Sequence, residues 1–229
     1  MINTAVILAG GFGTRLQQVV SDLPKPMAPV NDFPFLHYIL KDLRDKKFTR
    51  VILAVGYKCE SIMQYFGNSY LGIDIDYSIE AEALGTGGAI MQAVSNVTGI
   101  VAIINGDTFF DVDFNRMFIG FNNNKADIAI ALKPMKNFDR YGAVIIDNEN
   151  RITGFEEKKY VVEGYINGGV YVLDASFFDT QNFDKKFSFE KEVLEKLVTK
   201  KHFEGVIFDS YFIDIGIPED YYKAQSDFR

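Results

Sequence analysis

The chain has 229 residues, of which 48% are hydrophobic and 24% charged, and its formal net charge is −7 at pH 7. These values are typical of one large α/β domain or of two small lobes that share a core. The acidic balance argues against nucleic-acid binding, which normally requires a basic face, but a few local cations can still hold a nucleotide substrate. The sequence shows no signal peptide and no apolar run near the ~20 residues that span a bilayer, so we expect a cytoplasmic protein that binds no membrane.

The first half of the sequence alternates short apolar runs with segments of helical spacing. Strands are predicted at 5–9, 50–56, 73–79 and 99–105, and helices at 35–46, 60–66 and 87–97. Such alternation is typical of a three-layer α/β/α sandwich, in which helices cover both faces of a mixed, mostly parallel, Rossmann-like sheet.

The second half contains more strands. They are predicted at 127–133 and 165–173, in a hairpin at 141–155, and near 205–208 and 211–215; helices are predicted at 187–200 and from 218 onward. Proline at 218 suits the first turn of the last helix. Because no repeat or linker separates the halves, we predict one domain over 1–229 with lobes at about 1–110 and 111–229.

A glycine loop follows the first strand and reads Leu8-Ala9-Gly10-Gly11-Phe12-Gly13-Thr14-Arg15-Leu16. Glycines let the backbone approach a phosphate and direct several N–H groups at it. Arg15 adds a planar cation, and Lys25 adds a second cation on a segment stiffened by two prolines. The loop matches neither the P-loop pattern nor GxGxxG, so the glycines alone fit a tight strand-to-helix turn equally well.

Two aspartates are candidate metal ligands. Asp107 follows the strand at 99–105, where a carboxylate at the strand tip can hold Mg²⁺ or can cap a turn. Asp214 lies among apolar strand residues, and a buried carboxylate there needs a shared metal ion or an internal salt bridge.

Three further segments have a functional and a structural interpretation. The glycine-rich run at 84–88 either presents bare backbone to a flat base or caps a helix. The charged pair Glu157 and Lys158 either binds a ligand or is a solvated hairpin end. Asn167 with Gly168 either contacts a ligand or forms a bulge in a strand.

Six sequence blocks together resemble the signature of the sugar-1-phosphate nucleotidylyltransferases. They are LAGGFGTRL with PKPM, EALGTGGA at 82–89, NGD at 105–107, FEEK at 155–158, YINGGVYVL at 165–173 and FIDIGIPEDY at 212–221. The blocks run in the family's order from residue 6 to residue 222, so the resemblance covers nearly the whole chain. The chain departs from the family at Lys159, where proline is usual, and we expect it to lack the C-terminal β-helix that many members carry.

The resemblance implies that the first lobe binds a nucleoside triphosphate and the second a sugar 1-phosphate. The implied nucleotide-binding residues are Leu8, Ala9, Gly10, Gly11, Gly13, Thr14, Arg15, Lys25, Glu82, Gly85, Thr86 and Gly87. The implied sugar-phosphate-binding residues are Gly142, Glu157, Lys158, Asn167 and Gly168. Glu82 has an alternative in Glu80, which lies two residues upstream.

The resemblance also implies a reaction. Mg²⁺ would bind to Asp107 and Asp214, and Arg15, Lys25 and Asp107 would be the catalytic residues. An oxygen of the sugar phosphate would attack the α-phosphorus in line with departing pyrophosphate. Since that nucleophile is already an anion, no general base is required.

Within the family, the LGTGGA variant is most similar to members that transfer GMP to a heptose 1-phosphate. This similarity implies GTP and D-glycero-α-D-manno-heptose 1-phosphate as substrates, and a GDP-heptose for surface polysaccharide as product. GTP with mannose 1-phosphate, and dTTP or UTP with glucose 1-phosphate, are the alternative pairs. Two alternatives come from other functional classes: a nucleotide-sugar sensor without activity, and a glycosyltransferase that uses Asp111-Val112-Asp113 as its metal motif. The protein could also form a homo-oligomer, which the sequence does not decide.

Overall fold

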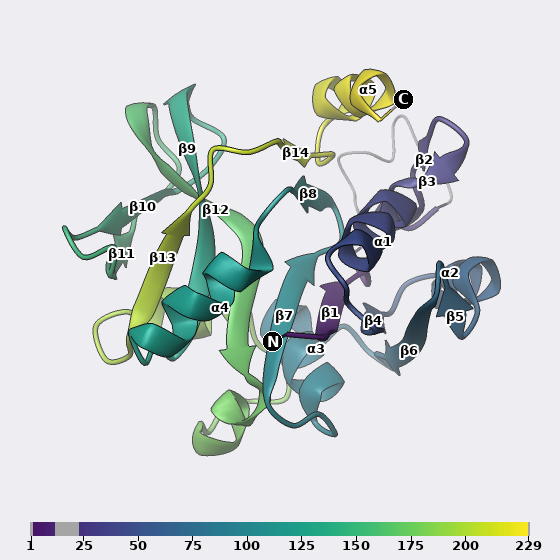
Figure 1. Cartoon of the computed structure of the whole chain (residues 1–229), viewed down its shortest axis with the longest axis horizontal. Coiled ribbons are helices and arrows are strands. Elements are labelled where there is room, and N and C mark those ends of the chain that lie inside the picture. The colour runs from purple at the N-terminus through teal and green to yellow at the C-terminus, as the bar shows by residue number, and fades with distance from the viewer. Residues whose placement is uncertain (1, 12–22, 229) are drawn as a thin grey trace.

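The computed structural model describes residues 2–11 and 23–228. Within these residues a ten-stranded sheet forms the centre of the molecule (Figure 1). Its parallel part has the order β7-β1-β4-β6 and comprises β1 (Thr4–Leu8), β4 (Arg50–Val55), β6 (Ile73–Ile79) and β7 (Ile100–Asn105). Because these strands are parallel, their carboxyl ends meet at one edge of the sheet, where ligands bind in such folds.

Helices cover both faces of the sheet. Ala5 and Ile7 of β1 belong to one hydrophobic core, and Val6 between them belongs to the other, as expected for a strand that is buried on both sides. The first core is completed by α1 (Phe35–Asp45), α2 (Cys59–Phe66), α4 (Phe114–Asn123) and α5 (Pro218–Asp227). The second is completed by α3 (Gly85–Val94) and by the helical segments η2 (Ala175–Thr180) and η3 (Phe189–Glu195). The predicted three-layer sandwich is therefore confirmed.

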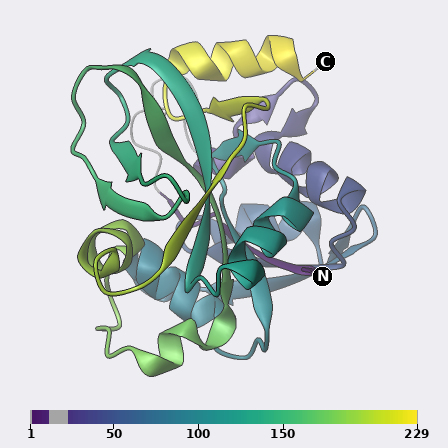
Figure 2. The same ribbon diagram turned by 60° about the vertical axis from the view of Figure 1, so that its left-hand side comes forward.

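The long strand β12 (Val161–Asp174) joins the two halves of the sheet. One edge pairs antiparallel with β7 and with β10 (Ala143–Ile146), and the other pairs with β9 (Ile128–Phe138). Two outer strands, β11 (Ile152–Phe155) and β13 (Phe203–Ile207), pair with β10 and β9. Figure 2 turns this half toward the viewer, with α5 in yellow along the top of the molecule.

Six short elements complete the described secondary structure. They are η1 (Lys25–Met27), β2 (Pro29–Val30), β3 (Phe33–Pro34), β5 (Ser69–Tyr70), β8 (Thr108–Phe110) and β14 (Phe212–Asp214). The side chain of Tyr221 in α5 donates a hydrogen bond to the carbonyl of Pro29. This contact ties the last helix to the segment that follows Lys25.

Three features differ from the sequence predictions. β9 and β12 are longer than predicted and continue through polar residues, because an antiparallel pair can leave one face in water. The predicted helix at 187–200 is a run of wide π-type turns over Phe189–Glu195. The helix α4 was not predicted; Asp113 caps it by accepting hydrogen bonds from the amides of Asn115 and Arg116.

In the part of the chain that the structure describes, no helix combines the length and the apolar character that a bilayer crossing requires.

Candidate active site

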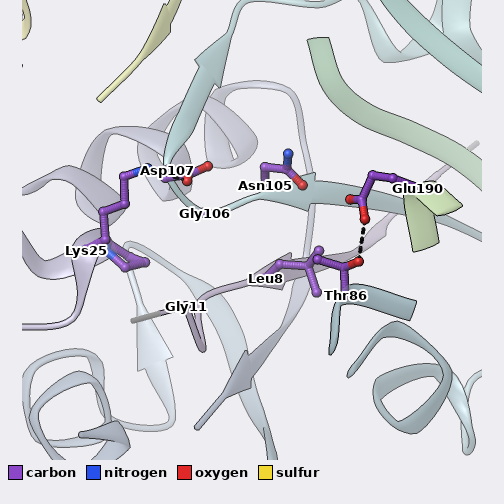
Figure 3. A pocket seen from close by; sticks show the side chains of 9 residues that line it. Leu8, Gly11, Lys25, Thr86, Asn105, Gly106, Asp107 and Glu190 are labelled. Atoms are coloured by element: carbon purple, nitrogen blue, oxygen red, sulfur yellow. Dashed lines mark hydrogen bonds and ion pairs between the residues drawn. The ribbon is translucent and has the colours of Figure 1, made fainter. Parts of the chain in front are cut away.

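Three adjoining cavities lie at the carboxyl ends of the parallel strands. The central cavity, of about 180 Å³, is lined by Leu8, Gly11, Lys25, Pro26, Thr86, Asn105, Gly106, Asp107 and Glu190 (Figure 3). The glycine cavity, of about 220 Å³, is lined by Leu8, Gly10, Gly11, Glu80, Ala83, Gly85, Thr86 and Ala89. The hairpin cavity, of about 440 Å³, is lined by residues of β10, β11, β12 and η3, including Gly142, Glu157, Lys158, Asn167 and Glu190. Shared lining residues connect the central cavity to the other two.

Backbone pairing brings the two predicted metal ligands together. Asp107 follows the end of β7 and directly precedes β8, and Asp214 ends β14. The antiparallel pair β8–β14 places Asp214 opposite Thr108, and the amide of Ile215 donates to the carbonyl of Asp107 at 3.0 Å. Residues far apart in the sequence thus meet at one point of the sheet edge.

Lys25 lies between these two carboxylates. Its Nζ is 2.5 Å from Oδ2 of Asp107 and 3.8 Å from Oδ1 of Asp214. Since both acids reach one nitrogen atom, a single cation can interact with both of them. The alternative interpretation of Asp214, an internal salt bridge, therefore matches its ion pair with Lys25.

Asp214 is held in a partly apolar surrounding. Its Oδ1 accepts a hydrogen bond from the amide of Gly216 at 2.7 Å, and its Oδ2 accepts one from the hydroxyl of Tyr141 at 3.4 Å. Burial raises the pKa of Asp214, and the nearby negative charge of Asp107 raises it further. Such a carboxylate is costly as an anion and gains from a positive partner.

The donor set of this acid pair fits a hard divalent cation. Two carboxylates are what Mg²⁺ commonly takes from a protein, with substrate phosphates and water completing its coordination. Among the described residues, no group of three or more histidine, cysteine, aspartate or glutamate side chains forms a closed metal site. An open, two-carboxylate site of this kind is suited to a metal that arrives with phosphates.

The start of the glycine loop passes close to Glu80. A Cβ added to Gly10 would lie 2.7 Å from Oε1 of Glu80, whereas one added to Gly11 would meet open space. The other oxygen of Glu80 accepts a hydrogen bond from the amide of Leu84 at 2.9 Å. A side chain at position 10 would therefore require the Glu80 carboxylate to move, whereas Gly11 presents bare backbone to two cavities. The predicted residues Gly13, Thr14 and Arg15 lie outside the described residues.

The two candidate acids of the glycine cavity lie in different places. Glu80 lines the cavity, whereas Glu82 is fully exposed and forms an ion pair with Lys185 at 3.0 Å. A hydrogen bond from Lys185 lowers the pKa of Glu82. The geometry thus favours Glu80, the alternative acid, for contact with a ligand in this cavity.

The glycines at 85–88 pack against a neighbouring segment. Added Cβ atoms at Gly85 and Gly88 would lie 2.5 and 2.4 Å from the backbone carbonyl oxygens of Phe187 and Lys185, and one at Gly87 would lie 2.1 Å from the Phe187 ring. The amide of Phe187 also donates to the carbonyl of Leu84 at 2.9 Å. The glycines therefore allow close packing on one side while the other side of the loop faces the cavities.

The predicted sugar-phosphate residues gather at the hairpin cavity, with one exception. Gly142, Glu157, Lys158 and Asn167 line it. Gly168 lies in a bulge of β12, and a Cβ there would be 2.4 Å from the ring of Phe110. This glycine thus makes room for a core side chain, as in the bulged-strand interpretation. Asn167 supports the same bulge, because its Oδ1 accepts from the amide of Gly169 at 3.0 Å.

Comparison with known proteins identifies the family. The nucleotidyl transferase family model matches residues 4–229. The chain belongs to the nucleotidyl transferase family. This nucleotidyl transferase is 54% identical to a D-glycero-alpha-D-manno-heptose 1-phosphate guanylyltransferase of Aneurinibacillus thermoaerophilus, over 98% of both chains. It is 49% identical to the protein of the same name from Campylobacter jejuni, over 95% of this chain and 96% of the other.

A solved structure supports the same relationship. HddC from Yersinia pseudotuberculosis, complexed with GMP-PN, superposes with a TM-score of 0.89 over the full length of both chains at 36% identity. Our nucleotidyl transferase is therefore similar in sequence to two guanylyltransferases and in fold to HddC, in each case over nearly its whole length. The chain is an enzyme that transfers a nucleotidyl group.

The sequence Asp111-Val112-Asp113 does not form a metal site in the described part of this nucleotidyl transferase. Asp113 caps α4, and Asp111 forms an ion pair with Lys46 at 2.8 Å. Neither aspartate lines any of the three cavities, so the glycosyltransferase alternative loses its metal motif.

Three residues at the site were not recognised in the sequence. Asn105 lines the central cavity, and its position in the NGD block was a signal that we did not use. Tyr141 contacts Asp214, and Glu190 lines both the central and the hairpin cavity. Nothing in the sequence distinguishes Glu190 from Glu192 or Glu195, which belong to the same helical segment.

Proposed function

We propose that this enzyme transfers GMP from GTP to D-glycero-α-D-manno-heptose 1-phosphate, forming GDP-heptose and pyrophosphate. The choice of substrates rests on the full-length identity of 54% and 49% to two relatives with that activity in their names. The observation that carries the reaction type is the Lys25 cation between two carboxylates, in the central cavity that connects the other two.

The glycine cavity suits the guanine base. Guanine presents an amino group and a ring N–H, which are both donors, and the carboxylate of Glu80 is an acceptor beside bare glycine backbone. A site that pairs these donors discriminates against bases that lack them by roughly 10⁴-fold or more. In this proposal Glu80 takes the role that the resemblance assigned to Glu82.

The phosphates belong in the central cavity. Lys25 and the predicted Arg15 would neutralise the triphosphate, and Lys158 would hold the phosphate of the sugar. Asp107 and Asp214 would hold Mg²⁺, which lowers the negative charge on the α-phosphate when it is bound. Because phosphoryl-type transfers depend on positioning and charge neutralisation, these residues supply what the reaction needs.

The chemical step is a single in-line displacement. A phosphate oxygen of the sugar substrate forms a bond to the α-phosphorus, and the bond between that phosphorus and the oxygen bridging to the β-phosphate breaks. The electron pair leaves with pyrophosphate. Lys25 and Lys158 offset the repulsion between the two anionic reactants, which is the main obstacle to their approach.

A pyrophosphate-release screen tests the proposal. GTP, ATP, UTP and dTTP would each be combined with the 1-phosphates of heptose, mannose and glucose, with Asp107→Asn as the inactive control. We expect release with GTP and the heptose phosphate at a rate at least tenfold above every other pair. Preference for GTP with mannose 1-phosphate, or for UTP or dTTP with glucose 1-phosphate, would replace the substrates; binding without release would indicate a sensor.

A cytoplasmic location and a homo-oligomeric state stay predictions, which cell fractionation and light scattering test.

A further inference from the structure

Glu190 lies where the central cavity and the hairpin cavity meet. It is the second residue of η3, after the capping residue Ser188. Figure 3 shows Glu190 and Thr86 at one end of the central cavity, with Lys25 and Asp107 at the other. Its carboxylate is therefore at the border between the predicted nucleotide and sugar sites.

One oxygen of this carboxylate is fixed by two hydroxyl groups. Oε2 accepts hydrogen bonds from Oγ1 of Thr86 at 2.6 Å and from Oγ of Ser188 at 2.8 Å. Oγ1 of Thr86 accepts in turn from the amide of Phe189 at 2.9 Å. The side chain thus has a defined orientation, and Thr86, which belongs to the nucleotide loop, helps to set it.

The other oxygen has no donor among the described residues. No hydrogen bond or ion pair to Oε1 of Glu190 is present in the described ranges 2–11 and 23–228. Glu190 lines both the central and the hairpin cavity. This carboxylate oxygen is therefore free to accept a hydrogen bond from a ligand that occupies them.

The charge of Glu190 selects which part of a ligand it meets. A carboxylate repels phosphate oxygens, whereas Lys25 and Lys158 attract them from other parts of the cavities. The hydroxyl groups of a sugar are donors and suit a free carboxylate oxygen. The negative charge of Glu190 is also felt by buried Tyr171, whose pKa it raises further after the effect of burial.

We propose that Glu190 binds a hydroxyl group of the sugar and that Thr86 acts as a positioning residue for it. This inference rests on the proposed function, because it assigns a sugar to the hairpin cavity. It predicts that Glu190 contributes to sugar recognition and that the nucleotide loop and the sugar site are coupled through one hydrogen bond.

The first test compares two glutamates of η3. Glu190→Gln keeps the shape but removes the charge, and Glu192→Gln is the matched control, because Glu192 pairs with Lys196 at 2.6 Å and lines none of the three cavities. We expect Glu190→Gln to raise the KM for the sugar phosphate between about tenfold and a hundredfold, as expected for the loss of a charged hydrogen bond. The KM for GTP should change less than about twofold, and the control should match the wild type.

Monodeoxy analogues of the sugar 1-phosphate identify the hydroxyl. The analogue that lacks the bound hydroxyl should bind the wild type weakly and should lose nothing further in Glu190→Gln, because the contact is already gone. A purely structural role for Glu190 would weaken all analogues equally. Glu190→Asp, which withdraws the carboxylate by one methylene group, provides the same comparison if the glutamine variant does not fold.

Thr86 gives the second test. Thr86→Val removes the hydroxyl at constant shape and should raise the KM for the sugar phosphate, and Thr86→Ser should recover most of that loss. If wild-type enzyme is active and Glu190→Gln keeps the sugar KM of the control, the inference is wrong and the proposed function stands. If wild-type enzyme releases no pyrophosphate with any sugar phosphate, the proposed function itself fails.

Discussion

Two glutamates that lie two residues apart have opposite surroundings. Glu80 is in the glycine cavity and accepts a hydrogen bond from the Leu84 amide, whereas Glu82 is at the surface with Lys185. The resemblance assigned Glu82 to the ligand and left Glu80 as the alternative, whereas the geometry favours Glu80. The position of Glu80 follows from the end of β6. Its amide still donates a hydrogen bond to the carbonyl of Val55 in the neighbouring strand β4, so its backbone stays beside the sheet.

This difference gives a prediction for GTP binding. Glu80→Gln should raise the KM for GTP by about tenfold, since it weakens a charged hydrogen bond to the base, and Glu82→Gln should leave it unchanged. Steady-state kinetics with GTP varied at saturating sugar phosphate measure both. An equal effect of the two substitutions would contradict the assignment of Glu80.

Asp214 should lower the thermal stability of the ligand-free protein, although we expect the reaction to need its carboxylate. The pKa of Asp214 is raised in the folded protein. Above this folded-state pKa, the ionised carboxylate lowers the free energy of unfolding. Below the pKa of the unfolded chain, Asp214 is neutral in both states and this cost is absent. Asp214→Asn should therefore raise the Tm of the ligand-free protein at pH 7 by about 2–4 °C. At the same time, turnover should fall at least about a hundredfold.

The pH dependence checks the cause of that gain. As pH falls through the raised pKa, wild-type Asp214 becomes neutral, and the Tm difference between variant and wild type should shrink. Calorimetry between pH 4 and pH 8 measures it. A Tm at pH 7 below that of the wild type would show that the contact with Lys25 outweighs the cost of burial.

The elements show why some parts of the fold were predictable and others were not. The strands β1, β4 and β7 are apolar runs that are buried on both faces, and that pattern identifies them without knowledge of the rest of the chain. The three-residue strand β8 was not predicted, and β14 was predicted at 211–215, but no local pattern shows that these two strands pair. They exist because they pair with each other, so the contact between Asp107 and Asp214 follows from tertiary structure and not from local sequence.

Helix α4 was missed for a different reason. Its sequence contains three asparagines and one glycine, which are weak helix formers. The helix forms because Asp113 caps it and because Phe114 and Met117 are buried against the sheet. Here packing outweighs propensity, which is common for helices in globular proteins.

The packed glycines of α3 provide a stability prediction. Gly87→Ala would place a Cβ 2.1 Å from the Phe187 ring, so we expect a loss of about 1–3 kcal/mol in the free energy of unfolding. Without a clash, alanine would stabilise a helix relative to glycine by about 1 kcal/mol. A measured loss of stability would therefore come from the contact with the Phe187 ring. Urea denaturation followed by circular dichroism measures it.

A matched glycine provides the control. In Gly154→Ala the added Cβ would meet only Cδ1 of Ile145, at an ordinary 3.8 Å, and stability should not fall. Combining Gly87→Ala with Phe187→Ala should cost less than the sum of the single changes, because the ring that clashes has been removed. Additive effects would mean that Gly87 acts through something other than this contact.

At the scale of the whole molecule, the two predicted lobes share one sheet. β12 hydrogen-bonds to β7 of the first half of the chain and to β9 and β10 of the second half. We expect the two halves to unfold together, so that amides of β7 and β12 exchange with deuterium at the same rate under mild denaturant. Hydrogen exchange with mass spectrometry tests this. If the amides of β1 and β4 stay protected after those of β12 have exchanged, the two halves unfold separately and the prediction is wrong.

The shared strand restricts how such an enzyme can be re-engineered. A cut after residue 110 would leave β7 with an open edge that invites pairing with other chains. The half after residue 110, which we propose binds the sugar phosphate, therefore cannot be exchanged as a unit for that of another transferase. If that proposal holds, new sugar specificity has to be introduced through the elements that surround the hairpin cavity, the β10–β11 hairpin and η3, while the shared sheet is left intact.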